Sequence, residues 1–166
     1  KSTLLAVLSG RLHPDTGVAS IAPRCRVGVV AQESPSQDRR SVHAVYESRL
    51  HDLRAQDPMA PTVPLRSLGL LSAADLAKPV AEISMGQQRR LALALALAGR
   101  PHVLLLDEPT NHISIALVDE LTDAFNTTEA AIALVTHDRQ LRRDLDSWPN
   151  LVLPDRTRSS TVEELS

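Results

Sequence analysis

The chain is poor in cysteine, in aromatic residues and in net charge, and each shortage excludes a class of protein. Cys25 is the single cysteine, so no internal disulfide can form, which fits a reducing cytoplasm. Aromatic residues make up 2% of the sequence, so a core must be built from leucine, valine, isoleucine and alanine. The net charge of −2 gives no overall attraction to nucleic acid. No apolar run approaches the roughly 20 residues that span a membrane.

The remaining composition is that of a globular domain or a piece of a larger one, with 43% hydrophobic and 23% charged residues in 166. Apolar runs predict strands, and apolar residues three or four positions apart predict helices. Strands are expected at 18–21, 26–31, 103–106, 131–135 and 151–153, and helices at 41–57, 65–71, 73–77, 84–99, 114–125 and 140–145. This alternation predicts an α/β fold with a mostly parallel sheet, followed by a polar tail at 154–166.

The most informative stretch is a buried strand that ends in two carboxylates, Asp107 and Glu108, followed by Pro109. Charge at the end of a buried strand is costly unless a cation or ligand meets it. In open α/β sheets, ligands bind at the carboxyl ends of the strands. A strand that ends in a solvated acidic turn is the alternative, and these residues alone do not decide between the two.

The segment Ser84-Met85-Gly86-Gln87 opens a long helix rich in leucine and alanine. Ser84 and Gln87 have the spacing of a capping box, which explains both residues without any function. Gly86 is not explained by capping, since glycine weakens a first helical turn by about 1 kcal/mol relative to alanine. A glycine there lets a ligand approach a helix N-terminus, which favours anions such as phosphate.

Three further pieces are compatible with a phosphate site, although each has an ordinary explanation. Lys1-Ser2-Thr3 stands before an apolar helix and matches the end of the phosphate-binding loop pattern G-x-x-x-x-G-K-[ST], without its glycines. Gln32 follows an expected strand, as many loop residues do. His137 follows a second expected strand. Its ordinary explanation is a loop histidine beside Asp138, an aspartate that caps the next helix.

Taken together and in this order, the five pieces resemble the nucleotide-binding domain of ABC ATPases over nearly all of residues 1–153. The sequence Asp-Glu-Pro-Thr-Asn-His at 107–112, together with Thr-His-Asp-Arg at 136–139, resembles motifs of the ABC-F subfamily. This subfamily contains cytoplasmic twin-domain ATPases that work on ribosomes. The resemblance is to the ABC-F resistance proteins of antibiotic-producing actinobacteria in particular. It implies a P-loop NTPase fold whose first strand and glycine loop lie outside this sequence, and therefore an N-terminally truncated domain.

The resemblance also implies a role for each piece. Lys1, Ser2 and Thr3 would hold ATP phosphates, with Ser2 and Asp107 as Mg²⁺ ligands. Gln32 would contact both the metal and the nucleotide. Glu108 would be the general base toward water, and His137 would contact the γ-phosphate. Ser84, Met85, Gly86 and Gln87 would form the signature motif, which caps an ATP held by a second ABC domain of the same parent chain.

Two residues depart from the pattern of the subfamily. Met85 replaces the first glycine of the usual Ser-Gly-Gly-Gln, and Ser114 stands where an aspartate is usual. Met85 is expected to crowd the site and tune its rate, and Ser114 to weaken a contact between the two domains. The missing glycine loop predicts weak or no activity for this chain alone, whereas hydrolysis is expected of the intact parent.

Residues 1–33 and 101–153 are expected to form the ATPase core, and residues 34–100 a helical subdomain that carries the signature helix. The short spacing between Gln32 and Ser84 favours the second domain of a twin protein. The ribosome, with its rRNA, is the expected partner. The alternatives are the cytoplasmic ATPase of a drug-efflux transporter and a non-enzymatic remnant.

Overall fold

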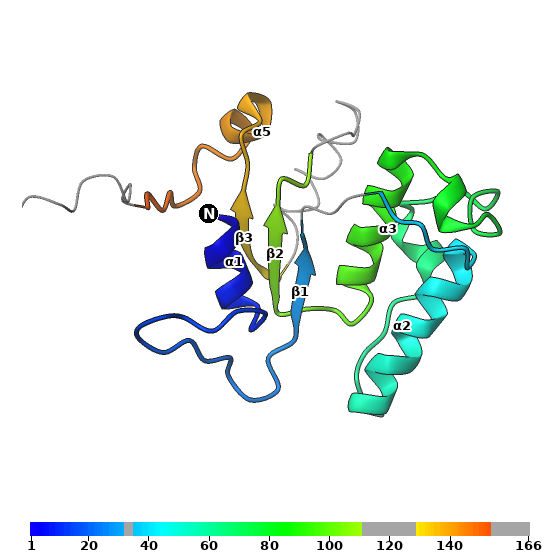
Figure 1. Ribbon diagram of the computed structural model, residues 1–166, viewed down its shortest axis with the longest axis horizontal. Helices are drawn as coiled ribbons and strands as arrows, with labels where there is room; N and C mark the ends of the chain where they lie inside the picture. The colour runs from blue at the N-terminus through cyan, green and yellow to red at the C-terminus, as the bar shows by residue number, and fades with distance from the viewer. Residues whose placement is uncertain (32–34, 111–128, 154–166) are drawn as a thin grey trace, which may run out of the picture.

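The computed structural model describes residues 1–31, 35–110 and 129–153. Its centre is a sheet of three parallel strands, β1 (Val27–Val30), β2 (Val103–Asp107) and β3 (Ala131–Val135), in the order β1-β2-β3. The register pairs Val27 with Val103, and Asp107 with Val135. The three strands predicted from continuous apolar runs are therefore confirmed. Their parallel direction places all three carboxyl ends at one edge of the sheet (Figure 1).

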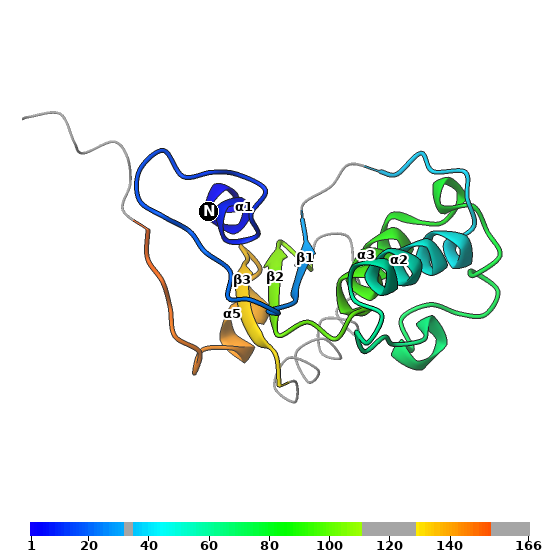
Figure 2. The ribbon, with the colours of Figure 1, turned by 90° about the horizontal axis from the view of Figure 1, so that it is seen from below.

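Helices cover both faces of this sheet (Figure 2). Helix α1 (Ser2–Leu8) contacts β2 on one face. Helices α3 (Met85–Leu97) and α5 (Arg139–Asp144) lie on the other face. Leu93 and Ala96 of α3 pack there with Leu104 and Leu106 of β2, which alternate with the residues on the opposite side of the strand. Among the described residues, no helix is both long and apolar enough to cross a membrane.

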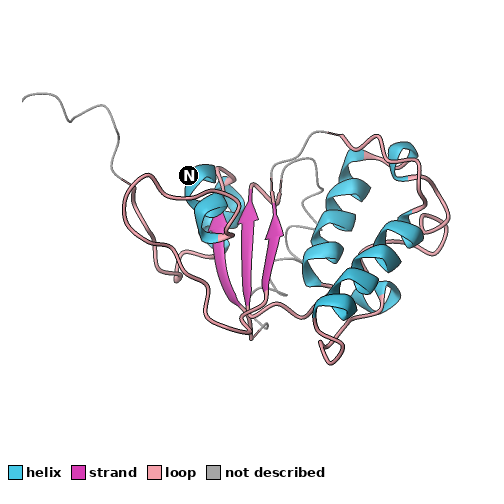
Figure 3. Cartoon of the chain, turned by 60° about the horizontal axis from the view of Figure 1, so that its bottom comes forward, coloured by secondary structure: helices cyan, strands magenta, loops and turns pink. Residues whose placement is uncertain are grey.

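The helical subdomain contains α2 (Val42–Gln56), the short helices η1 (Leu65–Leu68) and η2 (Val80–Glu82), and α3, and residues of all four share one core. Figure 3 shows its helices grouped at one side of the sheet. Its core includes Val42 and Tyr46, both 0% exposed, and the Tyr46 hydroxyl donates to the carbonyl of Val63. Burial raises the pKa of Tyr46 to about 12. Helix α3 contributes to this core through Leu91 and Ala94, and to the core at the sheet through Leu93 and Ala96, so in the described residues it joins the two.

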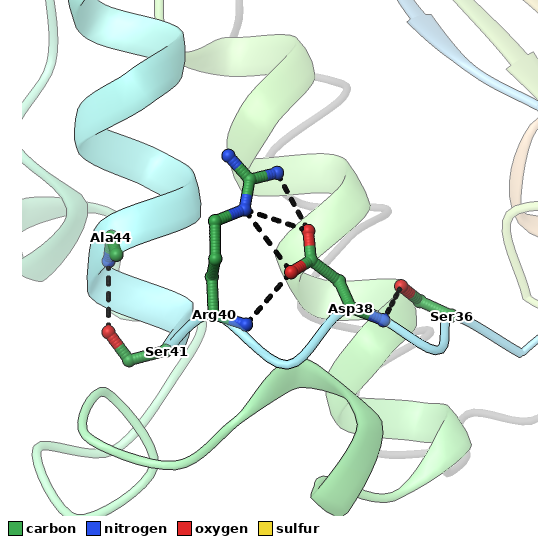
Figure 4. Close-up of polar contacts among 5 residues, drawn as sticks. All are labelled: Ser36, Asp38, Arg40, Ser41 and Ala44. Atoms are coloured by element: carbon green, nitrogen blue, oxygen red, sulfur yellow. Dashed lines mark hydrogen bonds and ion pairs between the residues drawn. The ribbon is translucent and has the colours of Figure 1, made fainter.

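The segment that enters α2 is fixed by local hydrogen bonds (Figure 4). The Ser41 hydroxyl accepts from the backbone N–H of Ala44 and caps the helix. Just before it, Arg40 forms an ion pair with Asp38 at 2.7 Å. Hydrogen bonds from Arg40 lower the pKa of the Asp38 carboxyl. These contacts explain why α2 begins at Val42, close to the predicted start.

Three predicted elements are not formed. Residues 18–21 and 151–153 are not strands, and residues 73–77 form turns rather than a helix. Val18 is 93% exposed and Leu151 is 75% exposed. Alternating or apolar patterns need a neighbouring strand to satisfy the backbone, and neither segment pairs with a strand in the described part of the chain. The helix predicted at 114–125 and the tail at 154–166 lie outside the described residues.

The stability of the helical subdomain is expected to depend on Asp75 at acid pH. Asp75 is buried, and hydrogen bonds from Lys78 and Ser72 lower the pKa of its carboxyl from 3.8 to about 2. A lowered folded-state pKa contributes stability above the unfolded value, and that contribution is lost as pH falls toward 2. An Asp75→Asn protein should therefore lose less stability than the unaltered protein between about pH 4 and about pH 2, measured by urea unfolding. Asp52→Asn, at an exposed position of α2, is the control; equal acid sensitivity of the Asp75→Asn and unaltered proteins would contradict the assignment.

Candidate functional site

The acidic pair stands at the carboxyl end of the middle strand. Asp107 is the last residue of β2, and Glu108 follows it with φ +49°. The Glu108 N–H donates to the carbonyl of Val135 at 2.8 Å, which ties the turn to β3. A non-glycine residue with this left-handed backbone is uncommon, and such strain is typical of functional positions. The alternative of a solvated acidic turn does not hold, because Asp107 is 6% exposed and Glu108 is 7% exposed.

His137 meets this turn from the end of β3. Its backbone N–H donates to Oε2 of Glu108 at 3.2 Å. Its ring atom Nε2 lies 3.6 Å from Oε1 of the same carboxylate, too far for a good hydrogen bond. The His137 side chain is 75% exposed, whereas that of Glu108 is 9% exposed. The structure thus holds one Glu108 oxygen by the backbone of His137 and places the imidazole at the surface beside the other.

Two carboxylate oxygens at this edge have no hydrogen-bond partner within the described part of the chain. They are Oδ1 of Asp107 and Oε1 of Glu108, and both are buried. Buried polar groups are normally satisfied, so each exception calls for an explanation. Hard, unpartnered carboxylate oxygens suit Mg²⁺, which takes one or two carboxylates together with phosphate oxygens and water. No cluster of three acidic, histidine or cysteine ligands occurs in the described residues.

Lys1, Ser2 and Thr3 are exposed at the start of α1, where Lys1 is the N-cap residue. The N-terminus lies near the carboxyl ends of β2 and β3 (Figures 1 and 3). The start of α1 therefore lies toward the same edge of the sheet as the acidic pair. Gln32 follows β1 but lies outside the described residues, as does Ser114.

The predicted capping box at the start of α3 is present. The Gln87 N–H donates to Oγ of Ser84 at 3.2 Å, and the Ser84 N–H donates to Oε1 of Gln87 at 2.8 Å. Asp138 likewise caps α5, through the N–H groups of Gln140 and Leu141. Because α1 and α3 lie on opposite faces of the sheet (Figure 2), Ser84–Gln87 and Lys1–Thr3 do not form one cluster.

Arg89 is a residue of this region that the sequence reasoning missed. From α3 it donates to the carbonyl of Ala31 at 2.6 Å, and to the carbonyls of Asp107 and Glu108 at 2.5 Å each. The sequence signal that could have identified Arg89 is its spacing. It stands four residues before Leu93, on the face of α3 that packs against the sheet. An arginine in an apolar helical stripe has to meet acceptors in the interior.

Comparison with known proteins decides the family. The ABC transporter family profile matches residues 1–111, which include the signature segment and the acidic pair. The chain belongs to the ABC transporter ATPase family. Its relatives place it beside the ABC-F proteins rather than the transporter motors, as predicted.

The chain is similar in sequence to two curated relatives and in structure to one solved protein. The tylosin resistance ATP-binding protein TlrC of Streptomyces fradiae is 43% identical over 142 residues, which cover 86% of this chain and 25% of TlrC. ABC transporter F family member 4 of Arabidopsis thaliana is 34% identical, over 85% of this chain and 20% of its own length. The dimeric ATP-binding cassette MJ0796, bound to ADP and phosphate, superposes with a TM-score of 0.66 at 20% identity, over 86% of this chain and 72% of that chain. The last match confirms the fold, and the chain spans a quarter or less of these two curated relatives.

Proposed function

We propose that this ABC ATPase chain is an ATP-binding and ATP-hydrolysing module of an ABC-F protein that acts on the ribosome in antibiotic resistance or translation. The observation that carries the proposal is the buried Glu108 carboxylate at the carboxyl edge of a parallel sheet. The His137 N–H holds one of its oxygens, and the other makes no hydrogen bond in the described residues. The similarity to a tylosin resistance protein supports the resistance part. The ribosome, a second ABC domain in the same parent chain and a cytoplasmic location rest on the resemblance to ABC-F proteins.

In this proposal the residues at the carboxyl edge of the sheet have different roles. Lys1 would pair with the β- and γ-phosphates. Ser2, Gln32 and Asp107 would hold Mg²⁺, which would neutralise phosphate charge. The Oε1 atom of Glu108 accepts a proton from the attacking water. Because its other oxygen is fixed by a backbone N–H, the carboxylate does not need to reorient before it accepts that proton.

His137 and Thr3 provide hydrogen-bond donors for the phosphate groups that the water attacks. The exposed His137 imidazole is free to turn toward a γ-phosphate, while its backbone keeps Glu108 in place. The Thr3 hydroxyl stands one residue after Ser2 at the start of α1.

The signature segment contacts a nucleotide held by the partner domain. Oγ of Ser84 accepts the capping hydrogen bond, and the hydroxyl hydrogen remains available to donate to a phosphate oxygen. Capping and phosphate contact are therefore compatible in Ser84. Gly86 admits the nucleotide close to the helix, Gln87 keeps the first turn fixed, and the Met85 side chain crowds the approach and tunes the rate.

The test uses the full-length protein that contains this chain. Phosphate release from ATP and ATP-dependent co-sedimentation with ribosomes are measured together. Hydrolysis with ribosome binding supports the proposal. Hydrolysis without ATP-dependent pelleting would contradict the ribosome as partner, and nucleotide binding without hydrolysis would favour the non-enzymatic alternative.

A further inference from the structure

The Arg89 side chain connects helix α3 to the ends of two strands of the sheet. It starts on α3, the helix whose first residues carry the signature motif, and it ends at the carboxyl ends of β1 and β2. The carbonyls of Ala31, Asp107 and Glu108 accept from it, so these three contacts fix the course of the main chain. Hydrogen bonds from a guanidinium are charge-assisted and stronger than bonds between neutral groups.

Two of these acceptors lie where a strand ends. Beyond Asp107 the chain leaves the sheet, so the carbonyls of Asp107 and Glu108 lie where the ladder of β2 ends. Glu108 also adopts φ +49°, a backbone that persists only where its surroundings impose it. Arg89 holds the carbonyl of this residue while Val135 accepts from its N–H. The strained turn is therefore held from both sides.

The neighbouring residue on α3 makes a second connection of the same kind. Oε1 of Gln88 accepts from the Ser36 N–H at 2.9 Å, and its Nε2 donates to the carbonyl of Val80 at 2.9 Å. The segment after β1 is thus tied to α3 as well. A shift of the signature helix would pull on both the acidic turn and this segment.

From these contacts we infer that Arg89 is a positioning residue, which holds the Asp107–Glu108 turn in its strained form and couples it to the signature helix. This inference rests on the proposed function for its effect on hydrolysis. Its structural part does not, because the hydrogen bonds of the turn can be measured without ATP.

The structural part is tested by amide hydrogen exchange in the full-length protein, comparing Arg89→Ala with the unaltered chain. The reporters are the N–H groups of Glu108 and His137, both hydrogen-bonded within the turn. Their exchange should become about tenfold faster or more, since hydrogen bonds to a charged group are worth that much. Amides of α2, in the other core, should keep their rates. Unchanged exchange at Glu108, or an equal rise in α2, would overturn the inference.

The matched control is Arg49→Ala, which removes a half-buried arginine from α2, away from the acidic turn. It should leave both sets of amides unchanged. Arg89→Lys should give intermediate exchange, because an ammonium lacks the planar fork that reaches several carbonyls at once.

The catalytic part is tested by steady-state hydrolysis. Arg89→Ala should lower kcat about 10- to 100-fold with little change in KM for ATP, because a misplacement of about 1 Å in a catalytic group has an effect of this size. Arg89→Lys should recover part of the loss. A kcat within about twofold of the unaltered protein, with faster Glu108 exchange, would overturn the catalytic consequence. If the unaltered protein hydrolyses no faster than its Glu108→Gln variant, the proposed function fails, and the exchange result still decides whether Arg89 holds the turn.

Discussion

Replacement of Glu108 by glutamine is expected to lower the rate of ATP hydrolysis about 10²- to 10⁴-fold, the usual contribution of a positioned general base. The amide has nearly the same shape as the carboxylate. Its oxygen can still accept from the His137 N–H, as Oε2 does in the structure. The substitution therefore removes the base without removing the contact that holds the turn. ATP binding should be retained, because Lys1, Ser2 and Asp107 are unchanged.

The measurement is single-turnover phosphate release by the full-length protein, with nucleotide binding measured on the same samples. The control is Glu82→Gln, which makes the same chemical change at an exposed position of η2. It should leave the rate unchanged. Equal rates for the Glu108→Gln and unaltered proteins would remove Glu108 from the mechanism, and an equal loss of nucleotide binding would assign it a structural role instead.

The parts of the fold that were predictable are those determined by local pattern. Continuous apolar runs predicted β1, β2 and β3, because such runs are typical of the strands of a parallel sheet covered by helices. The parallel direction then brought the residues after β2 and β3 to one edge, where Glu108 and His137 do meet. The spacing of Ser84 and Gln87 gave the start of α3, because a capping box is a local device.

What could not be predicted depends on contacts between distant segments. The segment at 18–21 has a strand-like pattern but no neighbouring strand in the described chain, and pattern alone does not supply one. Arg89 reaches carbonyls 18, 19 and 58 residues away in sequence. The positive φ of Glu108 has no local signal either, because it follows from being held between β3 and α3.

The second large effect is expected at Gly28, in the middle of β1. A Cβ atom there would lie 2.7 Å from the carbonyl oxygen of Ala96 in α3, and 3.0 Å from a methyl group of Leu104. The first distance is shorter than real contacts allow, and its partner is backbone, which cannot rotate away. Gly28→Val should lower the free energy of unfolding by about 1–3 kcal/mol through overpacking. Strand propensity acts in the opposite direction but spans only about 1 kcal/mol, so the contact should prevail.

Urea unfolding of Gly28→Val, Gly28→Ala and Ala131→Val separates these two effects. Ala131 is exposed on β3, so valine there gains strand propensity without meeting α3, and stability should change by no more than about 0.5 kcal/mol. Gly28→Ala should be destabilised and Gly28→Val more so; a Gly28→Val protein as stable as the unaltered one would show that α3 can move away from β1 at little cost.

The same displacement of α3 would lengthen the Arg89 bond to Ala31, whose carbonyl lies just beyond β1. Faster exchange of the Glu108 amide in Gly28→Val would therefore link the close packing of α3 on β1 to the geometry of the acidic turn.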